Sequence, residues 1–317
     1  MKMLHKILTA VPAILALSLP VGQAAATDTN TAAKDNCTAK PVHMVLENTE
    51  LRTLHSDITD RDYQLYIGYP DSYASNPDKH YPVVYLTDAY WSFVKMHSLG
   101  SSLWYDQAVP EFIVIGIGYV GENVNYGVER MFELSPSKQD YGWAAQMGDI
   151  RMGGSRLFLD SIRDEIIPYV DSNLRTDPSF RVMAGSSMGG LFSLFCMYEE
   201  PGLFQGVISS SPAVNWDHRW IFNRESQLHS KAIGDDERGT YSVPARLFMC
   251  VGSREWQEFQ ADIKAMDTII SNGNYADFAY EFRVLEGEHH GGGVAEAYNR
   301  GLRFVFEPMR PGDGPIE

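Results

Sequence analysis

Apolar residues in this chain occur either in short runs that predict strands or in rows at helical spacing. Tyr63, Leu65 and Ile67 alternate with polar or amphipathic residues, which is typical of a half-buried strand. Six further stretches are predicted as strands, several of them continuous apolar runs: 82–86, 112–117, 181–184, 206–208, 245–251 and 278–285. Continuous β-branched runs indicate a parallel sheet that is covered on both faces.

Helically spaced rows separate these strands. Phe158, Ile162 and Ile166 are four residues apart, so they share one helix face. Two further rows are Phe259, Ile263, Met266 and Ile270, and Tyr298, Leu302 and Phe306. Strands that alternate with helices predict an α/β fold with a mostly parallel, doubly wound sheet.

Two long segments, 120–154 and 213–243, follow neither pattern and are rich in Gly, Asn, Trp and charged residues. We predict that they are loops or lids over the carboxyl ends of the strands, where such sheets bind ligands. No internal repeat or Pro/Gly linker divides the chain. We therefore expect one domain over 41–310, followed by a tail at 311–317.

The N-terminus has the pattern of a secretory signal peptide over residues 1–26. Lys2 and Lys6 precede an apolar stretch over 7–21, and the small residues Ala24–Ala26 offer a cleavage site. The alternative is a membrane anchor, but the stretch is short and contains two prolines. We expect a periplasmic or secreted protein without a stable membrane anchor, and a flexible leader over 27–40.

Composition narrows the class of protein. Of the 317 residues 44% are hydrophobic and 21% are charged, which indicates a globular protein. The net charge of −15 disfavours a nucleic-acid partner, because phosphate backbones would be repelled. Cys37 lies in the leader, whereas Cys196 and Cys250 lie in apolar runs and are predicted to be buried free thiols. The oligomeric state is not predicted.

The candidate nucleophile is Ser187, in the pattern Gly185-x-Ser187-x-Gly189. A predicted strand precedes this pattern, and a stretch that is apolar nearly all round follows it over 188–198. Strand, tight glycine turn and buried helix together indicate a nucleophile elbow, in which the hydroxyl projects above the sheet. The alternatives are Ser186 as the reactive hydroxyl, or a Gly/Ser turn without chemistry.

A serine nucleophile needs a base, and in this architecture the order along the chain is serine, acid, histidine. The histidines after the serine are His218, His229, His289 and His290. His289 and His290 follow the strand predicted over 278–285, in a glycine-rich loop where the base is expected. The alternatives for this pair are a surface loop and a metal site, but no matching ligand cluster supports the latter.

The candidate acid is Glu255, about four residues past the strand predicted over 245–251, with Glu258 as second choice. A carboxylate there would hold the histidine tautomer and stabilise the imidazolium. The alternatives are a solvated surface charge for Glu255 and a Ser–His dyad that works without an acid.

An oxyanion hole requires two donors aimed at the developing negative charge. We predict that one is the backbone N–H of Met188, directly after the nucleophile. The other is the N–H of Ala89 or Tyr90, in the loop that follows the strand predicted over 82–86. We expect the side chain of Asp88 to shape this turn through hydrogen bonds to the backbone.

With these motifs the chain resembles the putative-esterase family of α/β-hydrolases, and most closely its bacterial trilactone-siderophore-esterase-like branch. The resemblance covers nearly the whole chain after the leader. It rests on seven stretches: 81–88, 115–119, 130–136, 158–168, 184–190, 211–216 and 287–290. The family usually has Gly-Glu-x-His in its last loop, which favours His290 over His289. The family also commonly has glycine where this chain has Ala89. The resemblance further implies that Arg130 and Trp216 lie near the mouth of the active site.

Several aromatic residues fall in segments expected around the serine: Tyr90, Trp91, Trp143, Trp216, Trp220 and Trp256. Each taken alone is compatible with ordinary packing, but together they favour an aromatic or bulky acyl group. The candidate substrate-binding residues are Trp91, Arg130, Trp216 and Trp256. The strong negative charge favours neutral esters, unless Arg130 and Arg254 form a local positive site.

The sequence thus predicts an exported serine carboxylesterase that acts on a small-molecule ester through an acyl-enzyme. Siderophore trilactones and hydroxycinnamate esters are the substrate types considered. The alternatives are an acyltransferase of the mycolyltransferase kind and a non-catalytic binding protein on the same fold. No cofactor and no metal ion are expected.

Overall fold

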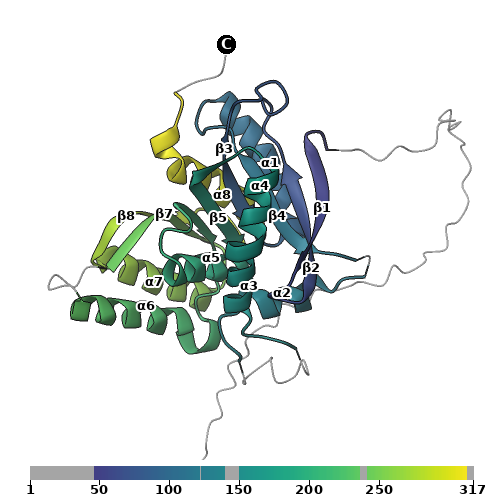
Figure 1. Cartoon of the computed structure of the whole chain (residues 1–317). Helices are drawn as coiled ribbons and strands as arrows, with labels where there is room; N and C mark the ends of the chain where they lie inside the picture. Colours follow the sequence, from purple (N-terminus) through teal and green to yellow (C-terminus); the bar gives the residue numbers. More distant parts are fainter. Residues whose placement is uncertain (1–45, 122, 140–149, 236–240, 313–317) are drawn as a thin grey trace, which may run out of the picture.

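Eight strands form one sheet through the centre of the molecule (Figure 1). This computed structural model describes residues 46–121, 123–139, 150–235 and 241–312. The strands lie in the order β1-β2-β4-β3-β5-β6-β7-β8. Their bounds are Thr49–Ser56 (β1), Arg61–Gly68 (β2), Tyr81–Leu86 (β3), Ile113–Tyr119 (β4), Thr176–Ser186 (β5), Gly206–Ser210 (β6), Tyr241–Gly252 (β7) and Tyr275–Leu285 (β8).

Strands β3 to β8 pair in parallel, whereas β1 pairs antiparallel with β2, and β2 antiparallel with β4. The mostly parallel sheet predicted from the sequence is therefore confirmed, and every predicted strand is present. The carboxyl ends of β3, β5, β6, β7 and β8 lie at one edge of the sheet, because these strands run in the same direction. The turns that follow them carry the candidate catalytic residues.

Helices cover both faces of the sheet (Figure 1). One face is packed by α1 and α8, and the other by α2 to α7. The helix bounds are Ala89–Tyr105 (α1), Tyr126–Leu134 (α2), Ser155–Ser161 (α3), Ile167–Asn173 (α4), Met188–Glu199 (α5), Trp216–Asp235 (α6), Gln257–Asn272 (α7) and Val294–Val305 (α8). A π-helical turn, Ile162–Ile166, joins α3 to α4, and a 3-10 turn, Glu307–Met309, follows α8.

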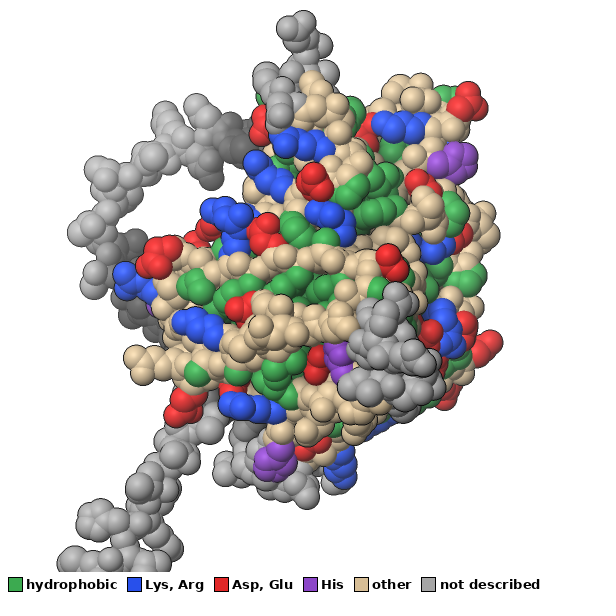
Figure 2. Space-filling model, turned by 90° about the vertical axis from the view of Figure 1, so that its left-hand side faces the viewer, with side chains coloured by type: hydrophobic (Ala, Val, Ile, Leu, Met, Phe, Trp, Pro, Cys, Tyr) green, Lys and Arg blue, Asp and Glu red, His purple; other side chains and the backbone are tan. Residues whose placement is uncertain are grey.

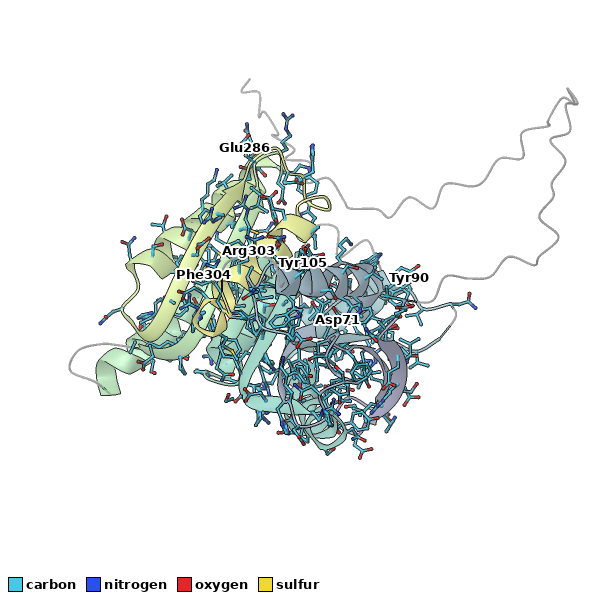
Figure 3. The ribbon with its side chains drawn as sticks, turned by 90° about the horizontal axis from the view of Figure 1, so that it is seen from above. Asp71, Tyr90, Tyr105, Glu286, Arg303 and Phe304 are labelled. Carbon is cyan, nitrogen blue, oxygen red and sulfur yellow. The ribbon has the colours of Figure 1, made fainter. Side chains whose placement is uncertain are left out.

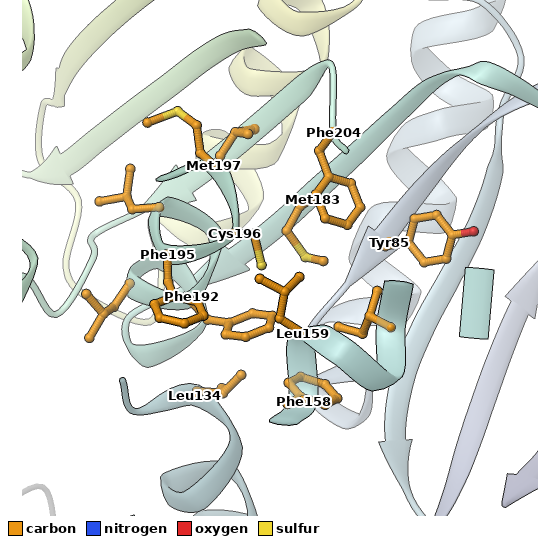
Figure 4. Close-up of a cluster of buried hydrophobic side chains, with 14 of the residues drawn as sticks. Tyr85, Leu134, Phe158, Leu159, Met183, Phe192, Phe195, Cys196, Met197 and Phe204 are labelled. Carbon is orange, nitrogen blue, oxygen red and sulfur yellow. The ribbon is translucent and has the colours of Figure 1, made fainter. Parts of the chain in front are cut away.

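The helix α5 lies behind the serine turn and is buried from Met188 to Tyr198. Its side chains Phe192 and Cys196 pack with Met183 of β5 and Phe158 of α3 (Figure 4). Burying one such large apolar side chain contributes about 1.5–3 kcal/mol. A helix that is apolar on all sides is therefore held rigidly, and it gives the turn at its N-terminus a fixed support.

The structure corrects the prediction at one strand, β1, and at three helices, since α1 begins where a loop was expected at Ala89 and Tyr90, and α2 and α6 were also missed. The edge strand β1 was not predicted, because Leu51 is exposed and only Leu54 packs on the core. The segments predicted as loops contain α2 and α6. Both helices bury a glutamate, Glu133 in α2 and Glu225 in α6. A buried carboxylate counts as polar in a hydrophobicity pattern, so the buried faces of these helices escaped the prediction.

The face at the β8 edge carries acidic and basic side chains that are interspersed (Figure 2). Ion pairs such as Arg283–Glu281 and Arg246–Glu307 place charge on or beside the outer strands. Charged side chains on an edge strand oppose pairing with a second sheet. Within the described ranges, no helix has the length and apolar character needed to cross a bilayer. The signal peptide and leader predicted from the sequence lie outside these ranges.

Candidate active site

Ser187 lies in the sharp turn between β5 and α5, with φ 60° and ψ −117°. Such a conformation costs a residue with a side chain about 1–3 kcal/mol, so the surrounding structure has to impose it. Two glycines make the turn possible. A Cβ at Gly185 would collide with the Gly189 carbonyl, and a Cβ at Gly189 would collide with the Thr87 hydroxyl. The turn has the geometry of a nucleophile elbow.

Glu255 lies in the turn after β7, and its side chain is fully buried. Its Oε1 accepts hydrogen bonds from the Ser211 hydroxyl at 2.5 Å and from the Gly252 N–H at 2.8 Å. Burial favours the protonated form of the carboxyl group. The hydrogen bonds from His290, Ser211 and Gly252 outweigh this effect and hold the pKa of Glu255 below its usual value. The residue is therefore an ionised acceptor.

His290 lies in the loop after β8, and its Nδ1 is 2.6 Å from Glu255 Oε2. An ionised carboxylate can only accept a hydrogen bond, so Nδ1 carries the proton and Nε2 is left as the basic nitrogen. His289 and Glu258 are both exposed. Of the residues considered from the sequence, the structure brings together His290 and Glu255.

Two aromatic rings flank the histidine. The ring centroids of Trp256 and Phe259 lie 5.7 and 5.4 Å from that of His290. These rings pack beside the imidazole and restrict its movement. Phe259 was predicted only as part of an apolar helix row. In the structure its ring also packs against His290.

The loop after β6 connects the serine turn to the acid. Ser187 N–H donates to the Ser210 carbonyl at 2.9 Å, and Ala213 N–H donates to the Ser187 carbonyl at 3.0 Å. Between them, Ser211 has a φ of 42° and directs its hydroxyl to Glu255. In the sequence, Ser211 belongs only to the stretch 211–216 that contributes to the family resemblance. Its position three residues past the strand predicted over 206–208 was the available signal.

The turns after β5, β7 and β8 thus place serine, acid and histidine at one sheet edge, in the predicted order. Among the described residues, the Ser187 hydroxyl makes no hydrogen bond to His290. Catalytic hydrogen bonds are often long in a free enzyme and tighten when substrate is bound.

The candidate oxyanion donors lie at two helix N-termini. Met188 begins α5, and Ala89 and Tyr90 begin α1. The first N–H groups of a helix have no carbonyl partner within that helix, so they remain available to an anion. The two helix starts are close, because a Cβ at Gly189 of α5 would lie 3.1 Å from the Asp88 carboxylate, directly before α1.

The expected role of Asp88 is wrong in its detail. Asp88 has the left-handed φ of 55° and no side-chain hydrogen bond to the start of α1. Its carboxylate instead accepts two hydrogen bonds from Arg130 of α2, from Nε at 2.7 Å and Nη2 at 2.8 Å. Arg130 is mostly buried in this pair, so its charge is compensated locally. Arg254, its suggested partner in a positive site, is exposed in the turn after β7.

The predicted substrate-binding tryptophans differ in exposure. Trp91 is 47% exposed and Trp256 is 46% exposed, so both offer a ring surface. Trp216 is only 5% exposed, and its indole N–H donates to the Ser137 carbonyl. Trp216 is therefore packed inside the protein and offers a ligand little surface. Trp143 lies outside the described residues.

An aromatic neighbour of Trp91 was not predicted. Tyr126, the first residue of α2, stacks on Tyr90 with 4.5 Å between ring centroids. It lies in a segment that shows no helical row, so the sequence carried no signal for it.

The arrangement combines a strained serine, a carboxylate-bound imidazole and two helix N-termini. These are the parts needed for nucleophilic attack on a carbonyl group and for stabilising the resulting oxyanion. Within the described ranges, no group of three or more His, Cys, Asp or Glu side chains is arranged to hold a metal ion.

Comparison with known proteins agrees with this geometry. The model of the family described as "Putative esterase" matches residues 56–290. The ferri-bacillibactin esterase BesA of Bacillus subtilis is 24% identical over 285 residues, which are 85% of this chain and 92% of that protein. The siderophore enterobactin esterase of Emericella nidulans is 26% identical over 183 residues, 55% of this chain and 60% of that protein.

The fold is shared with solved structures. The BES protein from Bacillus cereus superposes with a TM-score of 0.73 at 26% identity, covering 85% of this chain and 99% of that one.

Proposed function

This chain belongs to the putative esterase family, and we propose that it hydrolyses carboxylic esters through an acyl-enzyme formed on Ser187. The observation that carries the proposal is the 2.6 Å contact between His290 Nδ1 and Glu255 Oε2, beside a serine held at φ 60°. A serine hydroxyl is a weak nucleophile unless a base removes its proton. The carboxylate leaves the other imidazole nitrogen free to be that base.

In the first half-reaction His290 Nε2 takes the proton of the Ser187 hydroxyl as the oxygen attacks the ester carbonyl. The carbonyl oxygen becomes an oxyanion, which accepts hydrogen bonds from the N–H of Met188 and from that of Ala89 or Tyr90. When the intermediate collapses, the bond to the alcohol oxygen breaks and His290 returns the proton to that oxygen. The products are the free alcohol and an acyl group esterified to Ser187.

In the second half-reaction water takes the place of the serine hydroxyl. His290 removes a proton from the water, the hydroxide attacks the acyl carbonyl, and the proton passes back to the Ser187 oxygen as the acid leaves. Glu255 stays ionised throughout and stabilises the imidazolium that forms twice per cycle.

The proposed substrates are esters with an aromatic or bulky acyl group, of the siderophore trilactone or hydroxycinnamate type. Support comes from the relatives named as siderophore esterases. The exposed rings of Trp91, at the start of α1, and of Trp256, beside His290, also support it. We further propose a periplasmic or secreted location, from the signal-peptide pattern of residues 1–26.

The test is the Ser187→Ala variant, with the neighbouring Ser186→Ala as matched control. Turnover of ethyl esters should fall by about 10⁴–10⁶-fold in Ser187→Ala and stay within about threefold in Ser186→Ala. A fluorophosphonate should label the wild type and Ser186→Ala but not Ser187→Ala. Undiminished turnover in Ser187→Ala contradicts the proposal, and a wild type that neither turns over esters nor reacts with the probe indicates a binding protein.

A further inference from the structure

Three aromatic side chains form an exposed cluster where α1 begins. Tyr90 is 59% exposed and Trp91 is 47% exposed, unusually open for rings of this size. Tyr126 of α2 joins them: it stacks on Tyr90 at 4.5 Å with an interplanar angle of 22°, and it meets Trp91 edge-on at 5.9 Å. We call these three residues the aromatic platform.

The aromatic platform adjoins the proposed oxyanion site. Thr87 N–H donates to the Ala184 carbonyl, which lies three residues before the serine, so the chain entering α1 is bonded to the strand that carries Ser187. Tyr90 itself is labelled at one end of α1 in Figure 3, with Tyr105 at the other. Its ring therefore belongs to one of the two residues, Ala89 and Tyr90, whose backbone N–H would hold the reacting carbonyl.

Two side chains that pack against the platform, Arg130 and Tyr119, already have polar partners of their own. The Arg130 guanidinium lies 6.0 Å from the Trp91 ring, and its charge is matched by Asp88. The Tyr119 ring lies 5.9 Å from Tyr126, and its hydroxyl donates to Glu133 at 2.7 Å. A ring surface held in place by such contacts suits a planar ligand that can stack on it.

We propose that Tyr90, Trp91 and Tyr126 form a stacking subsite for a planar ring on the acyl side of the ester. This inference rests on the proposed function, because the subsite is defined by its place beside the proposed oxyanion donors. The class of ligand follows from the geometry: aromatic rings prefer offset-stacked or edge-on partners at 4.5–7 Å, and two members already present exposed ring surface. A puckered saturated ring of similar size cannot stack in this way.

The experiment compares ethyl 3-phenylpropanoate with ethyl 3-cyclohexylpropanoate, which have the same carbon skeleton but carry a planar aromatic or a puckered saturated acyl ring. Tyr126→Leu removes one ring of the platform and leaves the oxyanion donors in place. It should lower kcat/KM for the phenyl ester by about threefold to tenfold, mainly through KM, and leave the cyclohexyl ester within twofold. Tyr126→Phe should retain the wild-type preference, because it keeps the ring.

Tyr105→Leu is the control, since it removes a tyrosine ring that is 59% exposed at the far end of α1 from the platform. It should change neither ester. Equal losses on both esters in Tyr126→Leu, or no loss on either, would overturn the subsite. These outcomes leave serine catalysis standing, whereas failure of the proposed function appears separately as missing fluorophosphonate labelling and undiminished Ser187→Ala turnover.

Discussion

Two carboxylates follow strands on opposite sides of the serine-bearing strand β5, and their partners separate their roles. Asp88 follows β3 and Glu255 follows β7, both at the carboxyl edge of the parallel sheet. Each side chain is almost completely buried and is held by a nitrogen-bearing partner. For Asp88 that partner is Arg130, with two hydrogen bonds, and for Glu255 it is His290, with one.

The two pairs differ in whether they can transfer a proton. Arginine stays charged at every relevant pH, so the Asp88 pair can position atoms but cannot exchange protons. Histidine can exist in both states near neutral pH, so the Glu255 pair can hold a base ready. Similar placement therefore gives a structural pair at the start of α1 and a proton-transfer pair on the other side.

The strongest test of this contrast removes the base. His290→Ala should lower kcat for ethyl esters by about 10⁴–10⁶-fold, because nothing else accepts the serine proton. His289→Ala is the matched control, since its side chain is exposed beside the pair, and it should stay within about threefold. A larger loss in His289→Ala than in His290→Ala would mean that His289, and not His290, is the base.

Removing the charge of the acid is the next largest change. Glu255→Gln keeps the shape of the side chain, but its amide can donate to Nδ1 and so favours the wrong imidazole tautomer. Loss of an equivalent charge in a serine protease triad costs about 10⁴-fold in kcat, and we expect about 10³–10⁴-fold here. Steady-state kinetics of Glu258→Gln, which alters an exposed carboxylate, supplies the baseline. A loss below tenfold in Glu255→Gln would instead favour a Ser–His dyad.

Breaking the other pair should act on stability. Arg130→Met leaves the Asp88 carboxylate buried without its partner, which costs about 3–5 kcal/mol in the free energy of unfolding. Urea denaturation measures this loss. The double variant Asp88→Asn/Arg130→Met should recover part of it, because the uncompensated charge is gone. If Arg130→Met is as stable as the wild type, the Asp88 pair has no structural role.

The two pairs also show which residues of the site could be predicted from the sequence. Ser187 could be predicted because an elbow has a local glycine pattern. The pair His289 and His290 could be predicted because it follows the last strand, and the family resemblance favoured His290. Glu255 required only counting from a strand end. Arg130 was found through the family resemblance, but its partner could not be derived, because the contact joins residues 42 positions apart across two elements.

The fold was predictable where burial is apolar. The sheet and the helices α5, α7 and α8 follow from hydrophobic runs and rows. The helices α2 and α6 did not, since Glu133 and Glu225 occupy buried positions through hydrogen bonds from tyrosines. Tyr126, at the start of α2, was lost for the same reason. Partner-dependent burial of polar side chains is the information that a single-chain hydrophobicity pattern lacks.

Ser211 offers a smaller change on the acid side. Ser211→Ala removes the 2.5 Å hydrogen bond to Glu255 Oε1 but leaves the Gly252 N–H and His290 in contact with the carboxylate. A hydrogen bond to a charged group contributes about 1.5–3 kcal/mol, only part of which should appear in the barrier. We expect kcat to fall about threefold to tenfold, measured beside Ser253→Ala. An unchanged kcat would mean that the Ser211 hydrogen bond does not contribute to catalysis.

The smallest expected effect is the acid dependence of stability. The folded-state pKa of Glu255 lies below its unfolded value of about 4.3. Its contribution to stability is therefore complete above about pH 4.3 and is lost as the pH falls through the lower folded pKa. Glu255→Gln has no such proton to bind. The difference in free energy of unfolding between wild type and Glu255→Gln, measured in urea from pH 5 to pH 3, should move steadily against the wild type. Parallel curves would mean that the hydrogen bonds around Glu255 do not favour its ionised form, and the contrast with Asp88 would then rest on geometry alone.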